Sequence, residues 1–188
     1  FGNLIHHDYP NHDYDDLMSG VDAVIAKGYI DEENLFVTGG SGGGVLTAWI
    51  VGHTNRFRAA VVAKPVINWM SFVLYADGPA FFSKYWFEDK PWVKPESYLK
   101  RSPLTYVGNV ETPTMLLTGE EDYRTPIAES EQFYAALKLE EVETALVRIP
   151  GASHGIAARP SNLVAKIASV LAWFEKYRMN KEQPEGTE

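Results

Sequence analysis

The sequence predicts an α/β fold in which about four parallel strands are flanked by helices. Short apolar runs of strand length alternate along the chain with longer segments of helical periodicity, which is typical of a parallel sheet covered on both faces. The chain has 188 residues, of which 45% are hydrophobic and 22% are charged. It is therefore long and apolar enough to form one folded domain with its own core.

The first predicted elements are a helix, a strand and a second helix. Residues 13–27 carry apolar side chains at helical spacing and acidic residues in the first turn, with Asp13 as the expected N-cap. Residues 35–38 form a short apolar run that enters a cluster of glycines. Residues 45–51 continue from those glycines as an apolar segment of helix length. The order is therefore strand, tight turn and helix.

The second half of the chain repeats this alternation. Apolar runs predict strands at residues 59–63, 114–118 and 144–149. Helical patterns are present at residues 126–138 and 161–177, and the second of these helices closes the predicted fold. Strands that alternate with helices in this way are expected to pair in parallel.

Residues 69–106 interrupt the alternation with many aromatic residues, prolines and glycines but little clean periodicity. We expect an insertion in a domain that spans residues 1–178, followed by a polar tail over residues 179–188. Aromatic side chains of the insertion are expected to pack against one another and, at some positions, to contact substrate. Trp69 is the candidate for such a contact.

A glycine-rich pentapeptide, Gly39-Gly40-Ser41-Gly42-Gly43, fits the pattern G-x-S-x-G between a predicted strand and a predicted helix. This context is that of the nucleophile elbow of the α/β-hydrolase fold, in which a strained turn exposes the serine hydroxyl. Ser41 is therefore the candidate nucleophile, and the N–H of Gly42 is the candidate donor to an oxyanion. Phosphate-binding loops require G-x-G-x-x-G or a G-K-[ST] ending, and neither is present.

A serine nucleophile needs a base and an acid that orients the base, and in this fold the chain order is serine, acid, histidine. Asp122 follows the third predicted strand and His154 follows the fourth, at the strand ends where α/β sheets place their catalytic loops. These two residues are the candidate acid and base. Glu120 and Glu121 compete with Asp122, whereas His53 is better explained as a structural residue at a helix C-terminus.

A cluster of histidines and aspartates near the start of the chain superficially suggests a metal site. Its spacing matches no recognised ligand pattern, and its acidic residues are explained by the start of the first helix. We therefore expect no metal and no cofactor. The residues concerned are His6, His7, Asp8, His12, Asp13, Asp15 and Asp16.

Composition excludes several other classes of function. The formal net charge of −8 argues against nucleic acid or an anionic membrane as a partner. The absence of cysteine excludes disulfides, thiolate metal sites and a cysteine nucleophile. No apolar run approaches the length of a membrane span, and the first residues lack the features of a signal peptide. A cytoplasmic location is expected.

Several motifs in order resemble the catalytic domain of the prolyl oligopeptidase family, close to its acylaminoacyl-peptidase and dipeptidyl-peptidase members. They include D-Y-D-D-L-M-S-G-V-D, V-T-G-G-S-G-G-G, T-P-T-M-L-L-T-G-E-E-D-Y-R-T-P and P-G-A-S-H-G, and the resemblance covers nearly the whole chain. It implies Ser41 as nucleophile, Asp122 as acid and His154 as base of a serine peptidase. Trp69 and Gly40 are then expected to bind the substrate.

Members of that family carry further strands before the equivalent of Phe1, with an H-G-G-type loop that supplies a second oxyanion donor and usually a β-propeller. The resemblance therefore implies the C-terminal portion of an α/β-hydrolase fold whose N-terminal strands are missing. One sheet edge would be left unpaired, so we expect a homo-oligomer through that edge. Loss of one oxyanion donor typically costs on the order of 3 kcal/mol in the transition state.

The expected activity is cleavage of acylaminoacyl or dipeptidyl peptide bonds through an acyl-enzyme. Two alternatives stay open at this point. One is a carboxylesterase that acts on small esters, because an open site would not exclude them. The other is a catalytically weak or silent fragment that self-associates.

Overall fold

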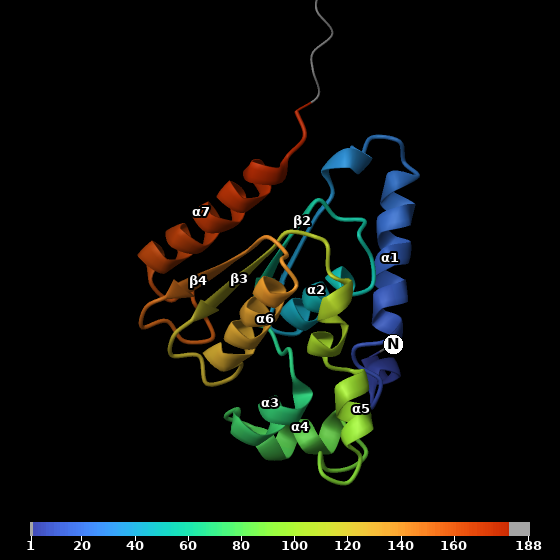
Figure 1. The fold of residues 1–188 in the computed structure, drawn as a ribbon, viewed down its shortest axis with the longest axis vertical. Helices are drawn as coiled ribbons and strands as arrows, with labels where there is room; N and C mark the ends of the chain where they lie inside the picture. Colours follow the sequence, from blue (N-terminus) through green and yellow to red (C-terminus); the bar gives the residue numbers. More distant parts are fainter. Residues whose placement is uncertain (1, 181–188) are drawn as a thin grey trace, which may run out of the picture.

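One parallel sheet runs through the structure, a computed structural model that describes residues 2–180 (Figure 1). Its strands lie in the order β1-β2-β3-β4, and every neighbouring pair is parallel. They span Phe36–Gly40, Ala59–Ala63, Thr114–Gly119 and Thr144–Ile149. The predicted α/β fold with about four parallel strands is therefore confirmed, and β2 and β4 have the bounds that their apolar runs predict.

Helices cover both faces of this sheet (Figure 1). Alternate side chains of the inner strands point to opposite faces: Val62 and Leu116 pack with α2 and α6, whereas Val61 and Leu117 pack with Trp173 of α7. β2 and β3 are buried along their whole length, which explains why they are continuous apolar runs rather than alternating ones. The long helices α1, α2, α6 and α7 span His12–Ile25, Gly42–Val51, Ile127–Leu139 and Pro160–Tyr177.

The aromatic segment after β2 forms three short helices that lie together at one end of the molecule (Figure 1). A second hydrophobic cluster, which also includes Tyr9 and Val45 of α2, holds them, and in it the rings of Phe87 and Tyr98 stack at 3.6 Å. The segment carries no periodic signal because each helix has fewer than two full turns. The bounds 69–106 of an insertion stay a prediction. The helices α3, α4 and α5 span Trp69–Tyr75, Pro79–Tyr85 and Pro95–Lys100, and 3₁₀ turns lie at Gly2–Ile5, Glu32–Asn34 and Pro103–Asn109.

The expectation that Asp13 caps α1 is wrong. The N-cap is Asn11, and Asp13 lies inside the first turn, where its carboxylate accepts the N–H of Asn11 at 2.8 Å. The acidic side chain therefore still satisfies a backbone donor at the start of the helix, but from a position two residues later. α1 also ends at Ile25, two residues before the predicted end.

β1 forms one edge of the sheet, with β2 as its partner in the described part of the chain. Beside it, α1 has no buried side chain, and Leu17 and Val24 are 42% and 39% exposed. These two side chains join Leu35 and Phe36 in lining an apolar hollow between α1 and the strand.

The polar tail predicted over residues 179–188 lies outside the described residues from residue 181 onward. Over residues 2–180, no helix has both the length and the apolar character that a membrane crossing requires.

Gly44 allows α2 to pack against β2. A Cβ at this position would lie 2.4 Å from the carbonyl oxygen of Ala63, whereas a Cβ on Gly43 would meet nothing within 4 Å. We expect Gly44→Ala to lower the free energy of unfolding by about 1–3 kcal/mol, because the backbone of the sheet has to move. Gly43→Ala is the matched control and is expected to be neutral or stabilising by up to about 1 kcal/mol. Urea denaturation of both variants measures the difference, and equal effects would contradict this packing argument.

Candidate active site

Ser41 occupies the sharp turn between β1 and α2. Its backbone has φ 60° and ψ −122°, a conformation that a residue with a Cβ adopts only under constraint. The constraint comes from both sides of the turn: the N–H of Ser41 donates to Ala63 O at 3.1 Å, and its carbonyl accepts from Gly44 and Val45 in the first turn of α2. The serine hydroxyl is thereby held at the start of a helix, beyond the end of β1.

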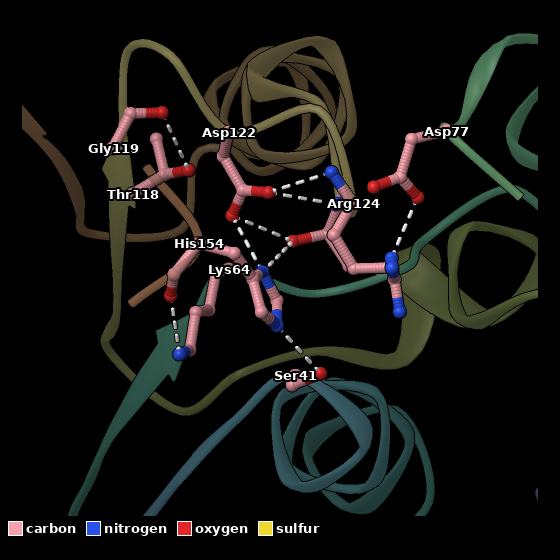
Figure 2. Close-up of polar contacts among 9 residues, drawn as sticks. Ser41, Lys64, Asp77, Thr118, Gly119, Asp122, Arg124 and His154 are labelled. Atoms are coloured by element: carbon pink, nitrogen blue, oxygen red, sulfur yellow. Dashed lines mark hydrogen bonds and ion pairs between the residues drawn. The ribbon is translucent and has the colours of Figure 1, made fainter. Parts of the chain in front are cut away.

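His154 lies within hydrogen-bonding distance of this hydroxyl. Its Nε2 is 3.0 Å from Ser41 Oγ, and its Nδ1 is 2.8 Å from Asp122 Oδ2 (Figure 2). The three side chains come from the loops after β1, β3 and β4. The structure therefore brings together the three residues that the sequence singled out as nucleophile, acid and base, in a continuous chain of hydrogen bonds.

The carboxylate of Asp122 is buried and fully hydrogen-bonded. Its Oδ1 accepts the N–H groups of Arg124 and Thr125, both at 2.9 Å, and its Oδ2 accepts from His154 and from the Thr125 hydroxyl at 3.0 Å. Burial alone would raise the pKa of Asp122, but the hydrogen bonds from His154 and Thr125 outweigh it and hold the pKa below its ordinary value. The carboxylate is therefore ionised at neutral pH.

The loops that carry the acid and the base contact each other directly. The N–H of Glu121 donates to the carbonyl of Ala152 at 3.0 Å. Glu120 was an alternative to Asp122 as the candidate acid in the sequence, but its carboxylate is paired with Arg148 of β4 at 3.0 Å. Of the three neighbouring carboxylates, Asp122 is the one that meets His154.

The other histidines make contacts of a different kind. His53 stacks on Trp49 at 4.1 Å and lies 2.7 Å from that residue's carbonyl, as expected of a structural residue near the end of α2. His6 and His7 stack on each other, and His12 pairs with Asp15 on the surface. Across residues 2–180, no three His, Cys, Asp or Glu side chains converge in a way that could hold a metal ion.

A cavity of about 210 Å³ opens beside Ser41. Ser41, Gly42, Arg124, Thr125 and His154 line its polar side. The rest of the lining is apolar or aromatic and comes from the segment before α1, from α2 and from residues 66–86, which include α3 and α4: Tyr9, Val45, Val66, Trp69, Phe72, Phe82 and Trp86. The hydroxyl of Ser41 therefore faces a small pocket whose lining is mainly apolar and rich in aromatic side chains.

Trp69 lies in this lining, and Gly40 does not. The Trp69 side chain is 2% exposed, its indole N–H donates to Arg101 O at 2.9 Å, and its ring stacks on Trp86 at 5.5 Å. The side chain of Trp69 therefore packs against its aromatic neighbours and also lines the pocket. Gly40 is the last residue of β1, where a Cβ would lie 3.2 Å from Lys64 Cε, and its role in substrate binding stays a prediction.

Comparison with known proteins assigns the chain to a family. The model of the prolyl oligopeptidase family matches residues 1–181. The chain belongs to this family. It is 43% identical to the uncharacterized peptidase YuxL of Bacillus subtilis and 32% identical to an acylamino-acid-releasing enzyme of Arabidopsis thaliana. These matches cover 94% and 88% of this chain but 27% and 22% of the relatives, so the chain spans about a quarter of their length.

Among solved structures, the acylaminoacyl peptidase of Pyrococcus horikoshii matches with a TM-score of 0.90 and 27% sequence identity. The match covers all of this chain and 31% of that protein. The sheet and helices of this prolyl oligopeptidase family member are therefore those of an α/β-hydrolase domain.

A buried carboxylate that supports the pocket was not predicted from the sequence. Glu129 of α6 is fully buried, and it accepts the N–H groups of Ile67 and Asn68 at 2.6 and 2.8 Å and the hydroxyls of Ser71 and Tyr75. Burial raises the pKa of Glu129 despite these hydrogen bonds. The carboxylate joins α6 to the start of α3, and so it fixes the aromatic side of the pocket relative to the loop of Asp122.

Two further residues beside the site were also missed. Lys64 has φ 42° and donates from Nζ to the carbonyl of His154 at 2.6 Å, which ties the end of β2 to the histidine loop. Arg124 lines the cavity and pairs with Asp77 at 2.6 Å (Figure 2). No local periodicity marks such residues. The only signal in the sequence was their position directly after a strand or after the candidate acid.

The lowered pKa of Asp122 makes a prediction about stability. A carboxylate whose folded-state pKa lies below the unfolded value, about 3.9, stabilises the fold above that value, and this contribution is lost as the pH falls through the folded pKa. We therefore expect the stability difference between the native chain and Asp122→Asn to be largest near neutral pH. It should shrink steadily below about pH 4.

Urea denaturation of both proteins between pH 7 and pH 3 measures this difference. Glu120→Gln is the matched control, because Glu120 is partly exposed and pairs on the surface. A difference between the native chain and Asp122→Asn that does not depend on pH would contradict the assignment.

Proposed function

We propose that this chain is a serine peptidase that cleaves acylated or short peptides through an acyl-enzyme. The observation that carries the proposal is the hydrogen-bonded chain from Ser41 Oγ through His154 to the buried carboxylate of Asp122. Each member has the partner that its role requires: a nucleophile needs a base, and the base needs an ionised acid that holds its ring orientation and tautomer.

In the first half of the reaction, Ser41 Oγ bonds to the substrate carbonyl carbon as its proton passes to His154 Nε2. The carbonyl oxygen becomes an oxyanion, and the N–H of Gly42 is the donor proposed to stabilise it. The C–N bond then breaks, and the amine leaves with the proton from His154. Water repeats the sequence on the resulting ester and releases the acid.

Gly42 suits the role of oxyanion donor because it opens α2. The first N–H groups of a helix have no acceptor within the helix, and the helix dipole favours negative charge at this end. The hydroxyl of Tyr9 donates to the carbonyl of Gly42 at 2.5 Å, which holds this first turn in place. Burial raises the pKa of Tyr9, with a further contribution from Asp13, so the phenol keeps its proton throughout the working pH range.

The aromatic cavity supports an apolar side chain or acyl group next to the scissile bond. Its small volume and the side chains of Trp69, Phe72 and Phe82 fit one ring or a branched aliphatic group. The relatives named acylamino-acid-releasing enzymes are the reason to propose acylated peptides in particular. Dipeptidyl substrates and small esters are the other candidates for the same pocket.

Covalent labelling by a fluorophosphonate tests whether the serine is active. We expect the native chain to be labelled and Ser41→Ala not to be labelled, with a loss of hydrolytic rate on the order of a millionfold. Ser153→Ala is the matched control, since it changes a serine next to the histidine and leaves the hydrogen-bonded chain intact. A native chain that is not labelled, or labelling that survives the Ser41→Ala substitution, would refute the proposal.

A second assay separates peptidase from esterase activity. Acyl-alanine p-nitroanilide, dipeptidyl p-nitroanilides and p-nitrophenyl esters are compared at equal concentration with Ser41→Ala as the blank. Hydrolysis of the acylated anilide supports the proposed peptidase. Turnover confined to the esters would favour the carboxylesterase instead.

We also propose that the chain associates with a second copy through the edge of β1. A free strand edge offers unpaired N–H and C=O groups, and two such edges can continue one sheet through a two-fold axis. The apolar hollow formed by Leu17, Val24, Leu35 and Phe36 lies next to this edge. Pairing would bury it together with the strand.

Light scattering after size-exclusion chromatography at micromolar concentration tests this association. The native chain is expected to dimerise with increasing concentration, and Leu17→Lys combined with Val24→Lys is expected to remain a monomer. Leu139→Lys is the control, because Leu139 is 84% exposed at the far end of α6. A native chain that stays monomeric at every concentration would contradict the proposal.

A further inference from the structure

A threonine hydroxyl lies against both the acid and the base of the site. Thr125 is 3% exposed, in the loop between β3 and α6. Its Oγ1 is 3.0 Å from Asp122 Oδ2 and 3.3 Å from His154 Nδ1, and these two atoms are themselves 2.8 Å apart. The hydroxyl, the carboxylate oxygen and the imidazole nitrogen therefore form a triangle around the hydrogen bond that orients the histidine.

The direction of the threonine hydrogen bond follows from the charge of its partner. An ionised carboxylate only accepts hydrogen bonds, so the hydroxyl of Thr125 donates to Asp122 Oδ2. The N–H of Thr125 donates to the other oxygen of the same carboxylate. Thr125 therefore supplies two of the four hydrogen bonds on Asp122, and its hydroxyl shares one oxygen with His154.

We propose that the Thr125 hydroxyl sets the strength of His154 as the base, by competing with the imidazole for Asp122 Oδ2. A donor on that oxygen withdraws negative charge from the atom that stabilises the imidazolium form. The histidine then loses its proton at a lower pH than it would without the hydroxyl, and Ser41 keeps its base further into the acid range. The inference rests on the proposed function, and Thr125 acts in it as a positioning residue.

Other charged groups near His154 are the same whether or not Thr125 carries a hydroxyl. Lys64 donates to the histidine carbonyl, and its pKa is lowered first by burial and then by the charge of Lys166 of α7. Arg124 is paired with Asp77. The phenol of Tyr9 lies across the cavity and keeps its proton. Because Thr125 is buried, replacing its hydroxyl by a methyl group adds little desolvation to the pair.

Thr125→Val removes the hydroxyl and keeps the shape of the side chain, whereas Thr125→Ser keeps the hydroxyl. We expect the acid limb of the pH profile, followed by p-nitrophenyl ester hydrolysis and by the rate of fluorophosphonate labelling, to move up by about 0.5–1 pH unit in Thr125→Val. This shift corresponds to an increase of about three- to tenfold in the proton affinity of the base. Thr125→Ser should keep the native midpoint.

An NMR titration of the histidine side chains in the same proteins gives a readout that does not need activity. His154→Gln identifies the signal of His154 among the five histidines. The titration midpoint of that signal is expected to rise in Thr125→Val. If the valine variant does not fold, Thr125→Ala, which also lacks the hydroxyl, is titrated in its place and the same rise is expected.

An unchanged midpoint in Thr125→Val or in Thr125→Ala, or a shift of equal size in Thr125→Ser, would overturn the inference. Failure of the native chain to react with fluorophosphonate would instead refute the proposed function. The NMR titration would then still decide what Thr125 does.

Discussion

The parallel register of the four strands is the constraint on which the site depends. Gly40 pairs with Ala63, Ala63 with Leu117, and Gly119 with Ile149, so the strands end almost level at one edge of the sheet. Residues that follow these ends are therefore brought to the same edge of the sheet, where contacts such as that between Glu121 N and Ala152 O hold their loops together. A shift of one residue in a single strand would turn its side chains to the other face and remove one member of the site.

Burial of a charge is the main energetic difficulty of this arrangement. A carboxylate as buried as Asp122 is unfavourable unless its lone pairs are satisfied, and two backbone N–H groups, a hydroxyl and an imidazole together do so. Glu129 meets the same problem with two N–H groups and two hydroxyls, but its pKa rises, whereas that of Asp122 falls. Asp122 accepts a hydrogen bond from the imidazole of His154, whereas the partners of Glu129 are N–H groups and hydroxyls. The imidazole of His154 therefore helps to keep the carboxylate of Asp122 ionised.

The parts of the molecule that depend on local pattern could be predicted from the sequence. β2 and β4 were placed with their observed bounds because each is a short, mainly apolar run, and Ser41, Asp122 and His154 could be placed because each lies shortly after such a run. The three aromatic helices were not predicted because they are too short for a periodic signal. Glu129 was missed because its partners lie across the fold. Thr125 lies three residues after Asp122, but its contact with His154 forms only where the loops after β3 and β4 meet.

The position of Ser41 directly after an edge strand links the candidate site to the surface of the molecule. Ser41 follows β1, whose ladder has β2 on one side, and its turn is held by Ala63 of β2 and by the first turn of α2. Within residues 2–180 no strand pairs with the other side of β1, and any chain that pairs there would restrict the strand that leads to Ser41. Because Asp122 and His154 follow β3 and β4, which lie farther from that edge, such pairing would constrain Ser41 more directly than it constrains Asp122 or His154.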